Sequence, residues 1–167
     1  MFIGIDPGLS GAIGIIDDDG SFVQVIDTPT ALIRNGNHAR REYAARDMVG
    51  ALAFHPGLLQ SRARANVHVF LEEQHSMPGQ GVRSMFTTGV GFGLWLGILA
   101  ALALPYTRVR PSTWKKELGL SRDKEQSRLR AQQLFPGAQL NLKKHEGRAE
   151  ALLLAWYGFK ELKGERS

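Results

Sequence analysis

Short runs of β-branched residues alternate with turn-forming residues along the first part of the chain. Phe2–Ile5 and Ala12–Ile16 are separated by the segment PGLSG, and Phe22–Ile26 follows a second turn, DDDG. Apolar runs of this length, bounded by Gly, Pro and Asp, are typical of strands joined by hairpins. The pattern predicts three consecutive antiparallel strands.

After Ile26 the apolar residues follow a longer spacing that favours helices. The segment TPTALIRNGNH is predicted to be a loop, and Ala39–Phe54 a helix that His55-Pro56-Gly57 ends. The remaining predicted elements are strands at Val67–Glu72 and Tyr106–Val109, and helices at Ser84–Leu104, around Trp114, at Asp123–Phe135 and from about Lys144 to Leu162.

The predicted element order is β-β-β-α-β-α-β-α-α. Three antiparallel strands followed by strand–helix–strand crossovers indicate an α/β protein, with a mixed five-stranded sheet covered by helices on both faces. We find no internal repeat or linker, so residues 1–167 are expected to form a single domain.

Composition excludes several kinds of site. The chain has no cysteine, so disulfides, thiolate zinc sites and cysteine nucleophiles are ruled out. No basic segment followed by an apolar stretch opens the chain, so we expect no signal peptide. The most apolar run, Val90–Leu104, contains three glycines and is shorter than the roughly 20 residues of a membrane span. It is predicted to be a buried core helix rather than a membrane segment.

The chain is basic, with a formal charge of +5 and a pI of about 9.8. Such a charge can serve solubility alone, or it can indicate an anionic partner, of which nucleic acid is the commonest. The cations are clustered in the segment Lys115–Lys144 and in RNGNHARR, which favours a nucleic-acid partner.

Acidic residues occur at three remote places with apolar surroundings. Asp6 ends the first predicted strand, Glu72 and Glu73 end the fourth, and Glu146 and Glu150 lie four residues apart early in the last helix. If the first and fourth strands are neighbours and the last helix crosses their ends, these carboxylates share one cleft. Crowded carboxylates are costly unless cations lie between them, and oxygen ligands without cysteine suit magnesium or manganese.

Each acid also has an ordinary structural explanation. An aspartate at a strand end is commonly a turn cap, glutamates after a strand are commonly solvated, and acids in a first helical turn complement the helix dipole. Spacing alone leaves these explanations open, and it is the joint occurrence of the acids in a basic chain that favours a metal site.

Three segments, GIDPGLSGAIGII, VFLEEQHSMPGQGVRSMF and KKHEGRAEALLLAWYG, resemble in order the RuvC family of Holliday junction resolvases, above all its shorter phage and prophage members. The resemblance implies an RNase H-like fold and a homodimer that nicks opposing strands of branched DNA, especially four-way junctions. It implies two Mg²⁺ ions per active site, with Mn²⁺ as a substitute. It also implies a cytoplasmic protein of a bacterial or phage-infected cell.

The same resemblance assigns the site residues. Asp6, Glu72, Glu146 and Glu150 would be the catalytic metal ligands, with Glu73 and His145 as alternative ligands or bases. Strand parity does not decide between Glu72 and Glu73, because a sheet covered on both sides tolerates either. The bacterial members carry an aspartate three residues before the final acid. Gly147 occupies that position here, and the acid is Glu146 instead.

The resemblance also suggests which residues contact DNA and the second subunit. Gly89, Gly93 and Gly97 recur at every fourth position of the predicted helix Ser84–Leu104, which would form the dimer contact or an internal packing face. The loop HSMPGQGVRS would enter the junction, with His75, Met77 or Phe86 against opened bases. The expected DNA-binding residues are His75, Gln80, Arg83, Lys115, Lys116, Lys143, Lys144 and Arg148.

Three other functions fit part of the pattern. A broader nuclease of the same fold would act on RNA–DNA hybrids or other branched DNA, and a junction-binding module would use the same surface without catalysis. The PGLSG turn after Asp6 also resembles the phosphate loop of actin-like ATPases, but that fold needs a second lobe that a chain of this length does not supply.

Overall fold

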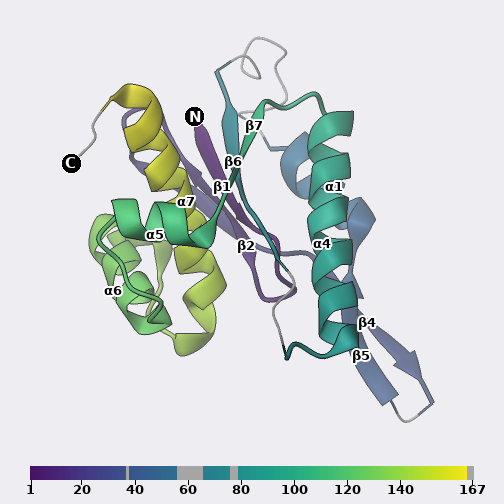
Figure 1. Cartoon of the computed structure of the whole chain (residues 1–167). Helices are drawn as coiled ribbons and strands as arrows, with labels where there is room; N and C mark the ends of the chain where they lie inside the picture. The colour runs from purple at the N-terminus through teal and green to yellow at the C-terminus, as the bar shows by residue number, and fades with distance from the viewer. Residues whose placement is uncertain (37, 56–65, 76–78, 165–167) are drawn as a thin grey trace.

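A mixed five-stranded sheet forms the centre of the computed structural model, which describes residues 1–36, 38–55, 66–75 and 79–164 (Figure 1). The strand order is β3-β2-β1-β6-β7. β1 pairs antiparallel with β2 and parallel with β6, so the predicted mixed sheet is confirmed. The strands are β1 (Phe2–Asp6), β2 (Ala12–Ile16), β3 (Phe22–Asp27), β6 (His68–Glu72) and β7 (Tyr106–Val109).

Helices cover both faces of this sheet, as predicted (Figure 1). α1 (Ala45–Ala53) and α4 (Val82–Ala101) lie on one face. The other face carries α5 (Pro111–Glu117), α6 (Lys124–Leu134) and α7 (Glu146–Lys163), with the 3₁₀ turns η1 (Pro136–Ala138) and η2 (Lys143–His145) between α6 and α7. Each of these helices was predicted to within a few residues, apart from α1.

Alternation along the strands divides the core into two apolar clusters. In β1, Ile3 and Ile5 face α1 and α4, whereas Phe2 packs on the α7 side. In β6, Phe70 belongs to the α7 cluster, and its neighbours Val69 and Leu71 belong to the other. Because side chains alternate with period two, Asp6 shares the α7 face with Phe2, and Glu72 shares it with Phe70.

Two glycines let α7 lie directly on the sheet backbone. A Cβ at Gly14 would lie 2.6 Å from the backbone nitrogen of Leu152, and one at Gly4 would collide with the carbonyl oxygen of Ala151. Gly4 lies on the same face of β1 as Asp6, two residues earlier. The close approach therefore brings the beginning of α7 to the strand end that carries Asp6.

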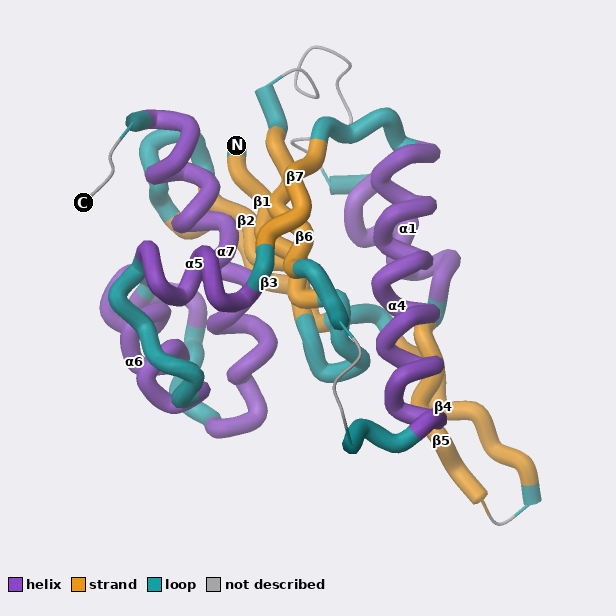
Figure 2. The backbone as a smooth tube through the Cα atoms, viewed as in Figure 1, coloured by secondary structure: helices purple, strands orange, loops and turns teal. Residues whose placement is uncertain are grey.

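One part of the fold prediction is wrong. The segment predicted as a loop and the first residues of the predicted helix Ala39–Phe54 form a two-stranded antiparallel hairpin, β4 (Thr30–Asn35) and β5 (His38–Tyr43) (Figure 2). The helix α1 therefore begins only at Ala45.

The hairpin escaped prediction because it has no buried face. Most of its described residues are exposed, so its sequence shows no apolar alternation. Asn35 pairs with His38, and Gly36 has a φ of +58°. The Gly-Asn dipeptide at 36–37 was the available signal, since it is one of the dipeptides that favour a two-residue hairpin connection.

Helix α4 has one buried and one exposed side. Trp95, Ile98 and Leu99 pack into the core, while Gly93 has no atom near the place its Cβ would take. The prediction of a wholly buried helix is therefore only half correct. Among the described residues α4 alone is long and apolar enough to cross a membrane, by length and composition, and 22% of its most apolar window is buried.

Replacing Gly14 with alanine should destabilise the protein, because the added methyl group must push α7 off β2. We expect Gly14→Ala to lower the free energy of unfolding by about 3 kcal/mol, at the upper end of overpacking costs. Gly50→Ala is the control. Its added methyl group meets only Phe54 at ordinary contact distance in α1, so it should be neutral or stabilising by up to about 1 kcal/mol. Urea unfolding measures both, and equal effects would contradict the packing role of Gly14.

Candidate functional site

A pocket of about 640 Å³ opens where β1 and β6 end and α7 begins. It gathers acids from the three remote segments that the sequence singled out, so the expected convergence is present. Four lysines from α5, α6 and η2 lie on the same walls. The lining residues are Asp6, Glu72, Glu146 and Glu150, then Lys115, Lys124, Lys143 and Lys144, and then Gly8, Ser10, Gly11, Gln74, Pro111 and Gly147.

The structure distinguishes Glu72 from Glu73. Glu72 is buried in the pocket wall, because it shares the α7 face of the sheet with Asp6. Glu73 points away from the pocket, where its carboxylate lies 3.3 Å from Nε of Arg110 and 3.8 Å from Nε of Arg108. The alternation of side chains along the strand could not decide between Glu72 and Glu73, and the position of α7 shows that Glu72 is the residue on the pocket side.

The departure from the bacterial pattern at Gly147 also has a structural reason. A Cβ at this position would lie 2.9 Å from Cα of Gly11 and would collide with the carbonyl oxygen of Ser10. α7 therefore rests on the β1–β2 turn with no room for a side chain. The acid one residue earlier, Glu146, lines the pocket instead.

Each pocket acid has a polar partner from the protein. Gly8 N–H donates to Oδ1 of Asp6 at 3.1 Å. Glu72 accepts two hydrogen bonds, at Oε1 from Nε1 of Trp114 (3.0 Å) and at Oε2 from Nε2 of Gln74 (3.1 Å).

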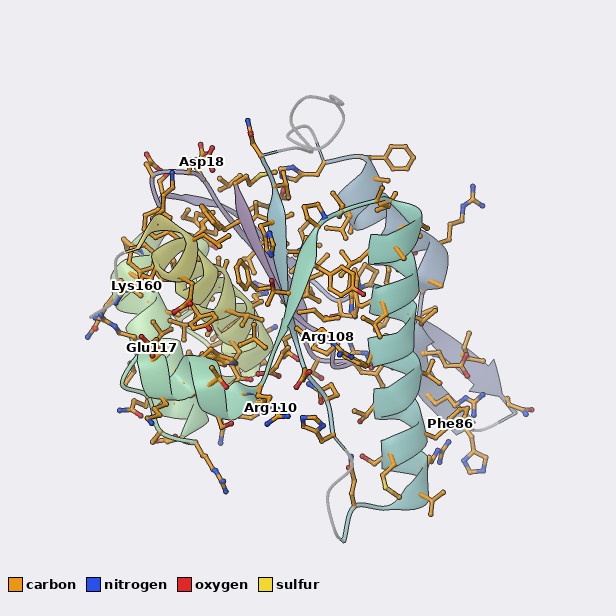
Figure 3. All side chains as sticks on the ribbon, turned by 45° about the horizontal axis from the view of Figure 1, so that its top comes forward. Asp18, Phe86, Arg108, Arg110, Glu117 and Lys160 are labelled. Atoms are coloured by element: carbon orange, nitrogen blue, oxygen red, sulfur yellow. The ribbon has the colours of Figure 1, made fainter. Side chains whose placement is uncertain are left out.

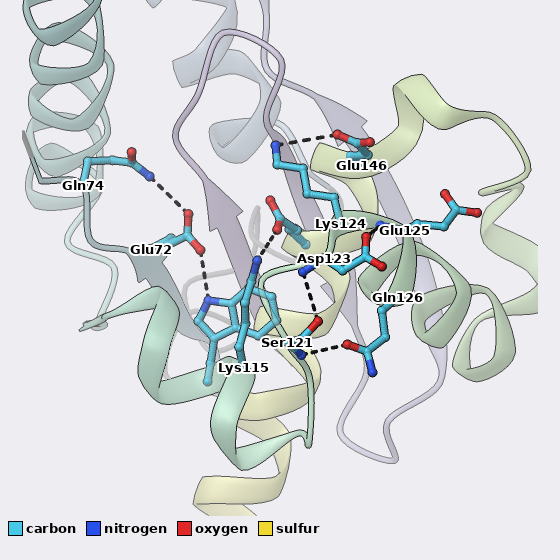
Figure 4. Close-up of polar contacts among 11 residues, drawn as sticks. Glu72, Gln74, Lys115, Ser121, Asp123, Lys124, Glu125, Gln126 and Glu146 are labelled. Carbon is cyan, nitrogen blue, oxygen red and sulfur yellow. Dashed lines mark hydrogen bonds and ion pairs between the residues drawn. The ribbon is translucent and has the colours of Figure 1, made fainter. Parts of the chain in front are cut away.

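The two acids of α7 are paired with lysines. Nζ of Lys115 donates to Oε1 of Glu150 at 2.6 Å, and Nζ of Lys124 lies 3.6 Å from Oε2 of Glu146. Figure 4 shows Lys115 and Lys124 reaching into the group from two different elements. The acids of the site are thus neutralised from within the chain.

Two of the acids hold their protons unusually tightly. Burial raises the pKa of Asp6 to about 6, and the nearby charge of Glu150 adds to the rise. Burial raises the pKa of Glu72 to about 8, with further repulsion from Asp6 and Glu150. Carboxyl groups with raised pKa values that interact with one another in a cleft are typical of a functional site.

The donor set suits hard divalent cations, because it consists of carboxylate oxygens. Asp6, Glu72, Glu146 and Glu150 are the residues that would hold such ions. Within the described part of the chain, however, no three His, Asp or Glu side chains are already grouped closely enough to hold an ion.

Several predicted site residues lie elsewhere. His145 is buried in the η2 turn, where Nδ1 accepts from the Leu142 N–H at 3.4 Å, and burial lowers its pKa. Arg148 forms a bidentate ion pair with Asp27 at 2.6 and 2.7 Å. Lys116 lines a separate hollow whose walls come from the end of α5, from α6 and from α7.

The described residues of the predicted DNA-binding loop do not line the pocket. His75 is exposed beside Glu73, Gln80 donates to Ser84, and Arg83 is exposed at the start of α4. Met77 lies outside the described residues. Contact of these residues with DNA stays a prediction.

Sequence reasoning missed three residues of the site. Gln74 and Trp114 both hydrogen-bond Glu72, and Lys124 pairs with Glu146. The position of Gln74, two residues after Glu72, was a usable signal, because alternation returns it to the same side of the strand. Nothing in the sequence linked Trp114 or Lys124 to acids that far away in the chain.

The raised pKa of Glu72 predicts a pH-dependent stability difference in chelator. Its folded pKa lies above the unfolded value, so its contribution to stability is complete below about pH 4.5 and is lost as pH rises through about 8. Glu72→Gln cannot ionise. Its free energy of unfolding relative to the parent should therefore increase between pH 5 and 9.

Urea titrations across this pH range measure the effect. A Glu72→Gln difference that stays constant across this range would contradict burial of an acid with a raised pKa.

Comparison with known proteins gives a consistent result. No family model matches the chain. Its sequence is 37% identical over 90 residues to the chloroplastic Holliday junction resolvase MOC1 of Chlamydomonas reinhardtii, which covers 52% of this chain and 10% of that protein. The chain thus spans about a tenth of the length of this curated relative.

Two solved structures have a similar fold. Thermus thermophilus RuvC in complex with a Holliday junction substrate superposes with a TM-score of 0.59 at 18% identity, over 97% of this chain and 94% of that one. Thermus thermophilus RuvC alone gives 0.52 at 20% identity, over 97% and 95%. The chain therefore has the fold of these RuvC structures, and about half of its sequence resembles part of a Holliday junction resolvase.

Proposed function

We propose that this protein is a metal-dependent endodeoxyribonuclease that resolves four-way DNA junctions by paired nicks. The observation that carries the proposal is the convergence of Asp6, Glu72 and Glu150 in one lysine-rimmed pocket on a RuvC fold. The matched half of the chain resembles a Holliday junction resolvase, and the structural neighbour was solved with a junction, which supports this choice of substrate.

The pocket acids would hold two Mg²⁺ ions, for which Mn²⁺ would substitute. Such ions supply activation of water and stabilisation of the leaving oxygen in phosphodiester cleavage. The chain itself orients the acids through Gly8, Gln74 and Trp114. Lys143 and Lys144 are exposed at the rim, where they would bind the phosphates next to the cleaved bond.

The proposed active form is a homodimer built on the outer side of α4. This side is apolar along its length, with Val82 and Phe86 at 79% and 73% exposure, and Gly89, Gly93 and Gly97 have open space above them. Phe86 lies on the side of α4 away from the sheet (Figure 3). A continuous apolar face of this kind is typical of a protein interface, and two-fold pairing would match the symmetry of a four-way junction.

A junction-binding module without catalysis is the second candidate. The observation that favours it is the lysine pairing of Glu146 and Glu150, which could keep ions out permanently. Direct measurement of cleavage separates the two candidates. Rates on four-way junction, flap, RNA–DNA hybrid and linear duplex then define how broad the nuclease is.

Removing a pocket acid should abolish cleavage of a synthetic four-way junction. We expect Asp6→Asn and Glu72→Gln to lose more than about 100-fold in rate, because loss of an outer-shell partner alone costs about 10- to 100-fold. Glu73→Gln is the matched control and should retain activity, since its neighbour and not Glu73 faces the pocket. Full activity of Asp6→Asn would refute the assigned metal site.

A charge on the outer side of α4 should separate the subunits. Val90 and Val49 are both 38% exposed on helices, but only Val90 lies on the proposed interface. We expect Val90→Arg to give a monomer in light scattering with unchanged ion binding, and Val49→Arg to behave as the parent. A parent protein that is itself monomeric at micromolar concentration would rule out the interface.

A further inference from the structure

Two adjacent residues of α5 contact two different pocket acids. The Trp114 indole donates to Glu72 at the end of β6, and the Lys115 ammonium donates to Glu150 on α7. Glu72 lies 42 residues from Trp114 in the sequence, and Glu150 lies 35 residues from Lys115. The short helix α5 therefore joins the strand and the helix that supply the site.

The Lys115–Glu150 pair is well enclosed. The side chains are 13% and 9% exposed, and Nζ lies 2.6 Å from Oε1. The ammonium also lies 5.1 Å from the centre of the Trp114 ring, within the range of a favourable cation–π contact. Lys115 is thus held over Glu150 by the residue before it, unlike the exposed Lys116.

A divalent ion and this ammonium would compete for Glu150. Mg²⁺ binds carboxylate oxygens at about 2.0–2.1 Å, so an ion on this carboxylate would lie close to the ammonium and the two cations would repel each other. Lys115 is the ion-pair partner of Glu150 within the described residues, and a buried carboxylate that loses such a partner is costly. The ammonium occupies this place in the ion-free protein.

We propose that α5 presets the ion site in two opposite ways: Lys115 is a built-in cation that a divalent ion must displace from Glu150, and Trp114 is a positioning residue that orients Glu72 toward the ion. This inference rests on the proposed function, because it assumes that the pocket binds divalent ions. Displacement leaves the Lys115 ammonium at the pocket wall, where a DNA phosphate is the natural partner.

Substitutions of Lys115 and Trp114 should change the ion affinity in opposite directions. Lys115→Met removes the competitor but keeps the length of the side chain, so Mn²⁺ should bind about 10- to 100-fold more tightly, the equivalent of one hydrogen bond to a charged group. Trp114→Phe keeps an aromatic ring beneath Lys115 but loses the indole N–H, so Mn²⁺ should bind about tenfold more weakly.

Calorimetric titration of the whole protein with Mn²⁺, without DNA, measures these affinities. Lys116→Met is the matched control, since it removes the same charge one residue away from the pair and should leave the affinity unchanged. Thermal unfolding in chelator checks folding. Lys115→Met should melt below the parent without ions and should gain more than the parent when Mn²⁺ is added.

The outcomes separate the inference from the function on which it rests. Equal Mn²⁺ affinity in the parent, Lys115→Met and Trp114→Phe would overturn the role of α5 while leaving a metal-dependent nuclease intact. Tighter binding by Lys116→Met to the same degree would reduce the effect to net charge and would also overturn it. No Mn²⁺ binding by any variant would refute the metal site itself, and the role of α5 with it.

Discussion

The contact between α7 and the backbone of β1 and β2 is the constraint on which the rest of the structure depends. Gly4 and Gly14 leave no side chains between helix and strands, and Gly147 repeats this arrangement against the β1–β2 turn. If side chains lay between α7 and the strands, the helix would lie farther from the sheet. Glu150 would then be too far from Asp6 for their charges to interact as they do. The glycines at these three positions therefore allow α7 to bring its acids close to Asp6.

The crowded acids that result are tolerated because the chain supplies its own counter-charges. Lys115 and Lys124 pair with the acids of α7. Hydrogen bonds from Gly8, Gln74 and Trp114 reach Asp6 and Glu72, and a pKa raised to about 8 favours the protonated form of Glu72 near neutral pH. Such a site is stable without ions and prepared for them. Because lysines pair with acids in the pocket, its carboxylates are compatible with the proposed binding of DNA by a protein of net positive charge.

The two sides of α4 connect this site to the proposed assembly. Its buried side packs against the face of the sheet opposite α7, through Trp95 and Leu99. Its outer side offers apolar residues and glycines to a neighbour. A partner on this side would hold two pockets in a fixed relation, and paired cuts in a branched DNA require such a relation.

The sequence by itself determined the strand order of the sheet's first half, most of the helices and the segments that carry the acids, because these depend on local spacing and turn chemistry. It missed the hairpin β4–β5, whose exposed strands have no apolar alternation. It could not choose between Glu72 and Glu73, or account for Gly147, because both depend on which face of the sheet α7 covers and how closely. The partnership of Trp114 and Lys115 with the acids likewise joins residues remote in the chain, and only packing in three dimensions decides such contacts.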